Sequence, residues 1–255
     1  KMALGENPKR VYGQQKKNPS TRMGNAAELR AALVNARNYL DKWARYEKEL
    51  TEYQEKTANE DEKAKQPKPP ERDLKLEALG RVLNREMMAR VHAHRADDML
   101  TAIRIAEEFN LDLSLEHATE GHKIADLLAQ KGVPVTAGPI LFSRMKYELR
   151  EMTPKNPGIM ANAGVKVAIQ TDEMSAVKYL PINAALAVRE GMSEDDALRA
   201  ITINAAEIIG VQDRVGSIEV GKDADVVILD GHPFDYRSQV QAVFVNGKIE
   251  YRRKE

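Results

Sequence analysis

The feature that constrains the fold most is an alternation of short apolar runs and amphipathic segments between residues 87 and 171. The apolar runs at 87–94, 111–117, 133–137 and 165–171 are predicted strands, and the segments at 98–109 and 122–130 are predicted helices. The run at 165–171 is largely apolar, which is typical of a strand that is buried on both faces of a parallel sheet. The alternation therefore predicts an α/β fold with parallel strands.

Two histidines, His92 and His94, close the first of these strands. Successive side chains on a strand point to opposite faces, so two residues that are two positions apart share one face. Apolar residues at spacings of three and four follow from residue 99, so the strand turns at once into a helix. In α/β barrels the active site lies at such carboxyl ends of strands. The motif is short, and a pair of hydrogen-bonded surface histidines fits it equally well.

The rest of the chain supplies further elements on either side. Residues 2–4 are a predicted strand, 9–21 a basic loop, and a long helix is expected from Asn25 or Ala26 to about residue 56. The highly charged, proline-rich stretch at 57–70 is a predicted solvated, mobile insertion. A helix follows at 74–84, and a long irregular segment at 138–164. Three more helices are expected at 181–190, 193–203 and 204–209, the second capped by Ser193.

The last forty-odd residues have a different character. The segments 216–230 and 240–248 are rich in β-branched residues, and Asn246-Gly247 is a type I′ turn signal between apolar runs. These strands do not continue the alternation of strand and helix. We therefore expect two domains, a partial barrel at 1–210 with the charged insertion near 57–70, and part of a small β-sandwich at 211–255.

Composition narrows the chemistry. Basic and acidic residues number 39 each, so nothing indicates a nucleic-acid partner, and no apolar run is long enough to suggest a membrane partner. The absence of cysteine excludes disulfides and thiolate metal sites. A metal here needs His, Asp, Glu or a modified Lys, which suits zinc, iron, manganese or nickel. No secretory-signal pattern is present in the first residues, and we expect a cytoplasmic protein.

Several motifs resemble those of one family. The tail "GSIEVGKDADVVILDG" followed by "VFVNGK", the strand ends "VHAH" at 91–94, "LEHATEG" at 115–121 and "QTDEMSA" at 170–176, and the helix "ITINAAEIIG" at 201–210 are similar to the metal-dependent amidohydrolases. The likeness is to the imidazolonepropionase-like and prolidase-like members of that superfamily. It implies a C-terminal part of a TIM-type (β/α)8 barrel, with the three strand ends as strands five, six and eight, followed by strands of a small β-sandwich.

The resemblance also implies roles for four residues. His92, His117 and Asp172 match the family's metal ligands, and Asp172 matches the carboxylate that moves a proton during catalysis. His94 is expected to contact substrate. For strand four, Lys1 and Glu6 both remain open as the ligand. Because the chain opens inside a predicted strand, we expect strands one to three to be absent, and the chain by itself to hold metal weakly and to be inactive.

The predicted function is hydrolysis of C–N bonds in amide, cyclic amide or amidine substrates by a metal-activated water, with zinc the favoured metal. The alternative is a non-catalytic amidohydrolase-like scaffold or oligomerisation protein. Besides a small-molecule substrate, the expected partner is either the N-terminal half of the same protein or a second copy of the chain, because an incomplete barrel leaves strand edges open. The sequence does not identify the substrate, because barrel loops set specificity.

Overall fold

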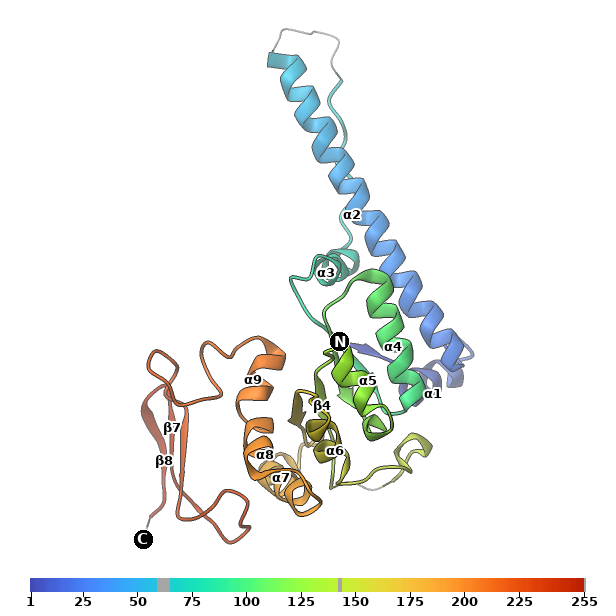
Figure 1. Ribbon diagram of the computed structural model, residues 1–255. Helices are drawn as coiled ribbons and strands as arrows, with labels where there is room; N and C mark the ends of the chain where they lie inside the picture. Colours follow the sequence, from blue (N-terminus) through green and yellow to red (C-terminus); the bar gives the residue numbers. More distant parts are fainter. Residues whose placement is uncertain (59–64, 142–143, 255) are drawn as a thin grey trace.

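The computed structural model describes residues 1–58, 65–141 and 144–254 of the chain, and a parallel five-stranded sheet lies at its centre (Figure 1). The strands lie side by side in chain order: β1 (Met2–Ala3), β2 (Ala89–Ala93), β3 (Leu113–His117), β4 (Val135–Ala137) and β5 (Val167–Ile169). All four neighbouring pairs are parallel. The predicted α/β class and the parallel sheet are therefore confirmed. Within the described residues β1 and β5 are the two edges of the sheet.

The strand register sorts the side chains into two sets. One set forms the main core with the helices, and its aligned members are Val91, Leu115, Val135 and Val167. The other set points to the opposite face, and its aligned members are Ala3, His92, Glu116, Thr136 and Ala168. The apolar set contributes most of the burial that holds the sheet together, because each fully buried side chain of this size contributes about 1.5–3 kcal/mol. The second set can then carry polar groups.

Three helices cover the apolar face: α4 (Ala96–Phe109), α5 (Ala125–Gln130) and α6 (Asn156–Asn162). Asp97 and Asp98 lie in the first turn of α4, where negative charge complements the helix dipole. The helix ends at Asn110, which adopts the left-handed conformation that often terminates helices. A short 3-10 turn, η1 (Gly121–Lys123), precedes α5, so the single helix that the sequence predicted at 122–130 is divided in two.

A long helix projects from this body (Figure 1). Helix α2 (Arg22–Ala58) packs its base on α4 through Leu33, which contacts Ile105 and Phe109. Farther out it runs beside α3 (Leu74–Leu83) and then away from the sheet. The predicted long helix is confirmed, although it begins at Arg22. Of the predicted insertion at 57–70, residues 59–64 lie outside the described residues, and residues 65–73 form neither helix nor strand.

Two predicted irregular segments contain helices. Helix α1 (Glu6–Gln14) occupies the first part of the stretch that was expected to be a loop. Pro8 does not prevent it, because a proline in the first turn removes an N–H that has no partner in the helix. The segment 138–164 contains the 3-10 turn η2 (Tyr147–Leu149) as well as α6, which has a proline in its first turn. Both expectations of wholly irregular structure were therefore wrong.

The remaining helices lead to a second sheet. The turn η3 (Val177–Tyr179) is followed by α7 (Leu180–Arg189), α8 (Glu194–Ala200), which Ser193 caps, and α9 (Ile203–Ile209). These helices pack against β5. The second sheet is antiparallel and consists of β6 (Val226–Leu229), β7 (Val240–Val245) and β8 (Lys248–Arg252). Asn246 and Gly247 both have positive φ, as the predicted type I′ turn requires.

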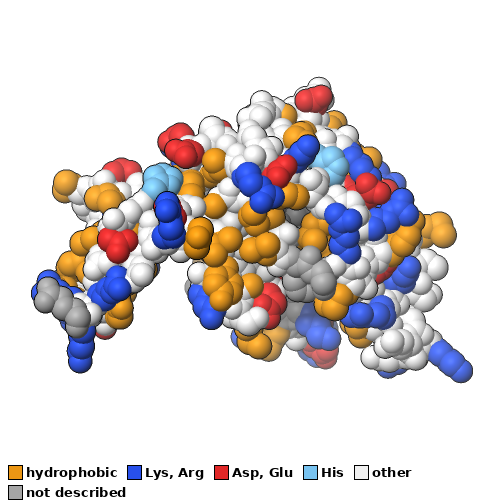
Figure 2. Space-filling view, turned by 90° about the horizontal axis from the view of Figure 1, so that it is seen from below, with side chains coloured by type: hydrophobic (Ala, Val, Ile, Leu, Met, Phe, Trp, Pro, Cys, Tyr) orange, Lys and Arg blue, Asp and Glu red, His pale blue; other side chains and the backbone are white. Residues whose placement is uncertain are grey.

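The surface carries both signs of charge. On the face that Figure 2 shows, hydrophobic side chains gather near the middle, with basic and acidic side chains around them. Among the described residues, none of the helices combines the length and the apolarity that crossing a bilayer requires.

Candidate metal centre

Three imidazoles meet at the carboxyl ends of β2 and β3. The ring centres of His92 and His94 are 4.7 Å apart, and the His117 ring lies 4.3 Å from the first and 4.5 Å from the second. One nitrogen from each ring falls within 4.8 Å of the others, and all three side chains are buried. A cluster of this size and composition is suited to a divalent metal ion.

The backbone at His117 explains how its ring joins the other two. His117 is in register with Ala93, so simple strand alternation would send it to the helix-covered face. Its φ is 73°, and that of Ala118 is 42°. Two successive non-glycine residues in the left-handed region end the strand and turn the His117 ring back between His92 and His94. Such costly backbone conformations are concentrated at functional sites.

Side-chain hydrogen bonds hold this strained turn. Asn156, at the start of α6, donates to the carbonyl of Ala118 over 2.9 Å and accepts from the backbone N–H of His122 over 2.7 Å. Asn156 is buried, so replacing it would leave both backbone groups without a partner. The side chain of Asn156 thus connects α6 to the backbone that positions His117.

Burial keeps the three rings neutral. It lowers the pKa of His92 to about 3 and that of His94 to about 2, because the charged imidazolium loses its hydration, and neighbouring positive charges add to the effect. Burial also lowers the pKa of His117, while the nearby Asp172 carboxylate acts in the opposite direction. Neutral imidazole is the form that binds metals, so the donor chemistry of the cluster fits a divalent ion.

Each ring also has a fixed neighbour on one nitrogen. Nδ1 of His117 lies 2.9 Å from the Gly138 carbonyl. Because a carbonyl only accepts, this shorter contact favours a proton on Nδ1 and a lone pair on Nε2, although the Gln170 amide nitrogen also lies 3.1 Å from Nδ1. Nε2 of His92 lies 3.2 Å from the Asn7 side-chain amide, whose oxygen accepts from Lys146 over 2.8 Å. Nδ1 of His94 lies 2.8 Å from the Thr119 hydroxyl.

Asp172 lies at the edge of the cluster. Its Oδ2 is 3.9 Å from Nδ1 of His117, and its side chain is half exposed. It lies three residues beyond the end of β5 with a φ of 49°, and is the third left-handed non-glycine residue at the site after His117 and Ala118. The structure thus brings His92, His94 and His117 into one group and places Asp172 beside it.

The two residues that remained open for strand four have other partners. In the register of β1 and β2, Lys1 lies opposite the residue two positions before His92, and its Nζ lies 3.6 Å from the buried Glu116. Glu6 begins α1, where its backbone N–H donates to Glu148. Ala3, which is level with His92 on β1, has no side chain that can bind a metal. Neither Lys1 nor Glu6 belongs to the three-histidine group.

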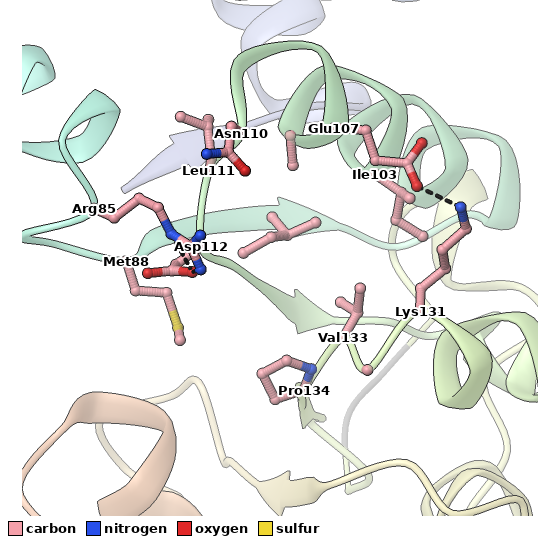
Figure 3. Close-up of a pocket in the computed structure, with 13 residues that line it drawn as sticks. Arg85, Met88, Ile103, Glu107, Asn110, Leu111, Asp112, Lys131, Val133 and Pro134 are labelled. Atoms are coloured by element: carbon pink, nitrogen blue, oxygen red, sulfur yellow. Dashed lines mark hydrogen bonds and ion pairs between the residues drawn. The ribbon is translucent and has the colours of Figure 1, made fainter.

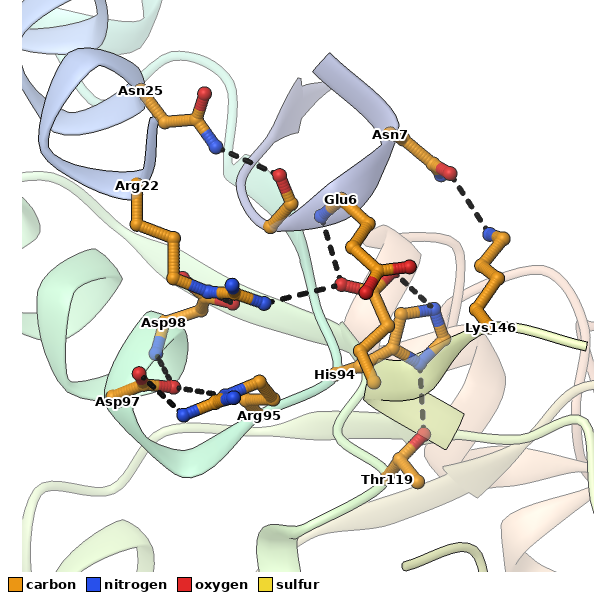
Figure 4. A network of polar contacts seen from close by, with 12 residues as sticks. Glu6, Asn7, Arg22, Asn25, His94, Arg95, Asp97, Asp98, Thr119 and Lys146 are labelled. Carbon is orange, nitrogen blue, oxygen red and sulfur yellow. Dashed lines mark hydrogen bonds and ion pairs between the residues drawn. The ribbon is translucent and has the colours of Figure 1, made fainter. Parts of the chain in front are cut away.

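A buried network of charged groups adjoins His94 (Figure 4). Arg22 donates to both oxygens of Asp98, and its Nη2 lies 3.7 Å from Glu148. Burial raises the pKa of Asp98 and of Glu148, partly offset by Arg22 for the first and by the Glu6 N–H for the second. Oε1 of Glu148 is 3.7 Å from Nε2 of His94 and has no hydrogen-bond partner.

Sequence reasoning missed the residues that support the histidines. Thr119 lies inside the motif "LEHATEG", so its place beside the strand end was a usable signal. Asn156 and Glu148 lie far along the chain in a segment without a recognisable pattern. Only the three-dimensional contact identifies them.

A cavity of about 480 Å³ lies elsewhere, at the amino ends of β2, β3 and β4 (Figure 3). The charged groups on its wall are paired with one another: Lys131 with Glu107 over 2.5 Å, and Arg85 with Asp112. Its other lining residues are mostly apolar. Among the described residues that line it, the cavity therefore presents no free ionic group to a ligand, and it lies at the opposite ends of the strands from the histidine cluster.

Comparison with known proteins gives one family. Residues 10–250 match the amidohydrolase family. The amidohydrolase tasK of Hapsidospora irregularis is 26% identical over 259 residues, which cover 98% of this chain and 25% of that protein. The imidazolonepropionase of Thermoplasma volcanium is 37% identical over 105 residues, 37% of this chain and 26% of that protein. The chain thus spans about a quarter of the length of these two relatives.

A solved structure matches the fold of nearly the whole chain. The crystal structure of an amidohydrolase from Thermotoga maritima MSB8 superposes with a TM-score of 0.86 at 43% sequence identity. The match covers 99% of this chain and 62% of that chain. The parallel sheet, its helices and the antiparallel sheet are therefore an arrangement that a solved amidohydrolase shares.

Proposed function

The chain belongs to the amidohydrolase family, and from that premise we propose that it serves metal-dependent hydrolysis of C–N bonds in amide, cyclic amide or amidine substrates. The observation that carries the proposal is the group of three neutral, buried imidazoles at the carboxyl ends of β2 and β3. The non-catalytic scaffold is not favoured. His117 and Asp172 both adopt the costly left-handed backbone conformation beside the cluster, and a scaffold would not need it.

His92 and His117 are the proposed metal ligands, together with Asp172, and zinc is the favoured ion. When bound, a divalent ion supplies a Lewis acid that polarises the scissile carbon and lowers the pKa of a water molecule to about 7. The Gly138 carbonyl keeps the proton of His117 on Nδ1 and leaves Nε2 free to bind. The Asn7 side-chain amide lies beside Nε2 of His92 and would have to move away if that nitrogen binds the metal.

Asp172 is the proposed proton carrier. Its carboxylate is half exposed, so it can reach both a water molecule and a substrate at the mouth. It takes a proton from the attacking water and passes it to the leaving nitrogen, so that the C–N bond breaks as the C–O bond forms. His94 is proposed to contact the substrate, since its ring lies beside both proposed histidine ligands.

The test is hydrolysis of a panel of amides, cyclic amides and amidines, with zinc supplied, by the intact parent protein, which is the form that we expect to be active. Asp172→Asn keeps the shape of the side chain but removes the proton carrier, so we expect turnover to fall by about 10²–10⁴-fold. Glu173→Gln is the matched control, because Glu173 is the next carboxylate along the chain and is exposed. Equal activity of Asp172→Asn and Glu173→Gln would contradict the assignment.

A further inference from the structure

The hydrolysis proposed above leaves one buried carboxylate without a role. Glu148 lies on η2 and is fully buried, and its two oxygens have different surroundings. Oε2 accepts the backbone N–H of Glu6 over 2.8 Å and lies 3.7 Å from Nη2 of Arg22. Among the residues that the structure describes, Oε1 has no hydrogen-bond partner, and it lies 3.7 Å from Nε2 of His94.

The donors around Oε2 fix which oxygen faces His94. The N–H of Glu6 is one of the donors at the start of α1 that have no partner in the helix, and Gly5 has no side chain to accept it. The side chain of Glu148, 142 residues away in the sequence, accepts this N–H instead. Gly5 also makes room for this contact, since a Cβ there would lie 2.7 Å from Oε2. Only Oε1 is therefore available to His94.

The chemistry of the neighbours then fixes the proton on the ring. A neutral imidazole carries a single N–H, on either Nδ1 or Nε2, and the groups beside the two nitrogens decide between them. The hydroxyl of Thr119, 2.8 Å from Nδ1, can donate or accept. The N–H of Glu6 and the Arg22 guanidinium at Oε2 stabilise the ionised carboxylate, which can only accept, so Oε1 favours the tautomer with the proton on Nε2. In that tautomer Nδ1 accepts from Thr119.

We propose that Glu148 is a positioning residue that holds His94 with its proton on Nε2. His94 is then a hydrogen-bond donor at the mouth, suited to an acceptor such as a substrate carbonyl oxygen, and it is not a third histidine ligand of the metal. The separation of 3.7 Å is longer than a hydrogen bond, and catalytic contacts of this kind shorten when a ligand binds. The role of the His94 N–H as a donor to substrate rests on the proposed function, whereas the assignment of the proton to Nε2 rests on the contacts of the ring alone.

Glu148→Gln is a sharp test, because the amide has only one oxygen. That oxygen must face the Glu6 N–H and Arg22, which are both donors, so the NH₂ group faces Nε2 of His94. Nε2 then becomes an acceptor and the proton moves to Nδ1. The ¹⁵N resonances of the two His94 ring nitrogens should exchange their positions in spectra of the protein labelled with ¹⁵N-histidine.

The chain has five histidines, so the spectrum is simple, and loss of one ring's signals in His94→Asn identifies His94. Glu151→Gln is the matched control, because Glu151 lies on the same segment and its side chain is 40% exposed. It should leave the His94 resonances unchanged. If Glu148→Gln also leaves them unchanged, the proposal is overturned.

Thr119→Val tests the same claim from the other side and does not disturb Glu148, which matters if Glu148→Gln fails to fold. Glu148 alone should then keep the proton on Nε2. A shift to the Nδ1–H tautomer would show that Thr119 orients the ring, and would overturn the proposal.

Addition of zinc distinguishes a failure of this proposal from a failure of the proposed function. On zinc addition the His92 and His117 resonances should shift, while His94 keeps the pattern of a protonated Nε2. Zinc binding at Nε2 of His94 would overturn the positioning role. If no histidine resonance responds to zinc, the proposed metal function fails, and the tautomer comparison still decides the role of Glu148.

Discussion

Burial determines the charge of the imidazoles, and that makes the stability of the metal-free protein depend on pH. Histidines of the unfolded chain take up protons near pH 6.5, whereas folded His92 stays neutral down to a pKa of about 3. Between these values the unfolded state binds more protons. The free energy of unfolding therefore falls as the pH falls through this window.

We expect His92→Gln to flatten this dependence. The wild-type chain should lose roughly 1.4 kcal/mol more per pH unit than the variant between about pH 6 and pH 4, since one pKa unit corresponds to that energy. Chemical denaturation at several pH values in the presence of a chelator measures it. His232→Gln, at an exposed histidine in the loop between β6 and β7, should match the wild type. A parallel decline in His92→Gln would contradict the burial argument.

For single residues, the sequence predicted which side chains form the site better than it predicted the contacts that those side chains make. The spacing of His92 and His94 on a strand was sufficient to place both rings on one face, and the end of the next strand marked His117. The left-handed φ of His117 was not predictable, because alternation alone directs its side chain to the other face. Glu148 depends on a loop that folds back over the site, and local sequence carries no record of that contact.

Helix α1 shows how an element can depend on a distant residue. Basic and polar residues, with one glycine and one proline, made the stretch 9–21 resemble a loop, yet the helix begins at Glu6, where Glu148 accepts its first N–H. The start of α1, the turn at Gly5 and the segment after β4 therefore form one structural unit beside His94.

Gly5→Ala tests that unit. Gly5 has a φ of 85°, and an added Cβ would lie 2.7 Å from Oε2 of Glu148 and 3.1 Å from Asp98. Backbone strain of about 1–2 kcal/mol and the displaced carboxylate should together lower the free energy of unfolding by roughly 2–4 kcal/mol. Gly132→Ala is the control, because Gly132 also has positive φ but has nothing within 4 Å, so it should show the strain alone. Equal losses measured by urea denaturation would refute the close approach.

The base of α2 should be as important for stability as the sheet. Leu33 is fully buried against α4, so Leu33→Ala should cost about 2–5 kcal/mol in unfolding free energy. Met23→Ala, on the same helix but at a side chain that is 81% exposed, should change it by less than about 0.5 kcal/mol. Thermal or urea denaturation compares the two. A small loss for Leu33→Ala would show that the projecting helix is only loosely attached to the body.

At the scale of the whole molecule, two sheets of different kind share the chain. The alternation of strand and helix predicted the parallel sheet, and the turn at Asn246-Gly247 predicted the hairpin of β7 and β8. Residues 216–225 form no strand, although their composition resembles the strands that follow, because β-branched residues alone do not provide a pairing partner. The numbering of the parallel strands as four to eight of a barrel remains a proposal, as do the domain limits near residue 210.

The central claim is that His92 and His117 hold a divalent metal at the carboxyl ends of β2 and β3. Titration of the 255-residue chain with Co²⁺, followed by the ligand-field absorption of the bound ion, tests it most directly and also detects weak binding. We predict absorption that rises to a plateau corresponding to one bound ion per chain, with the same affinity in the wild type and in His232→Gln. In His92→Gln and His117→Gln we predict at least tenfold weaker binding, because outright loss of a ligand removes more affinity than loss of a residue that only orients one. Identical titration curves for His117→Gln and His232→Gln would contradict the account.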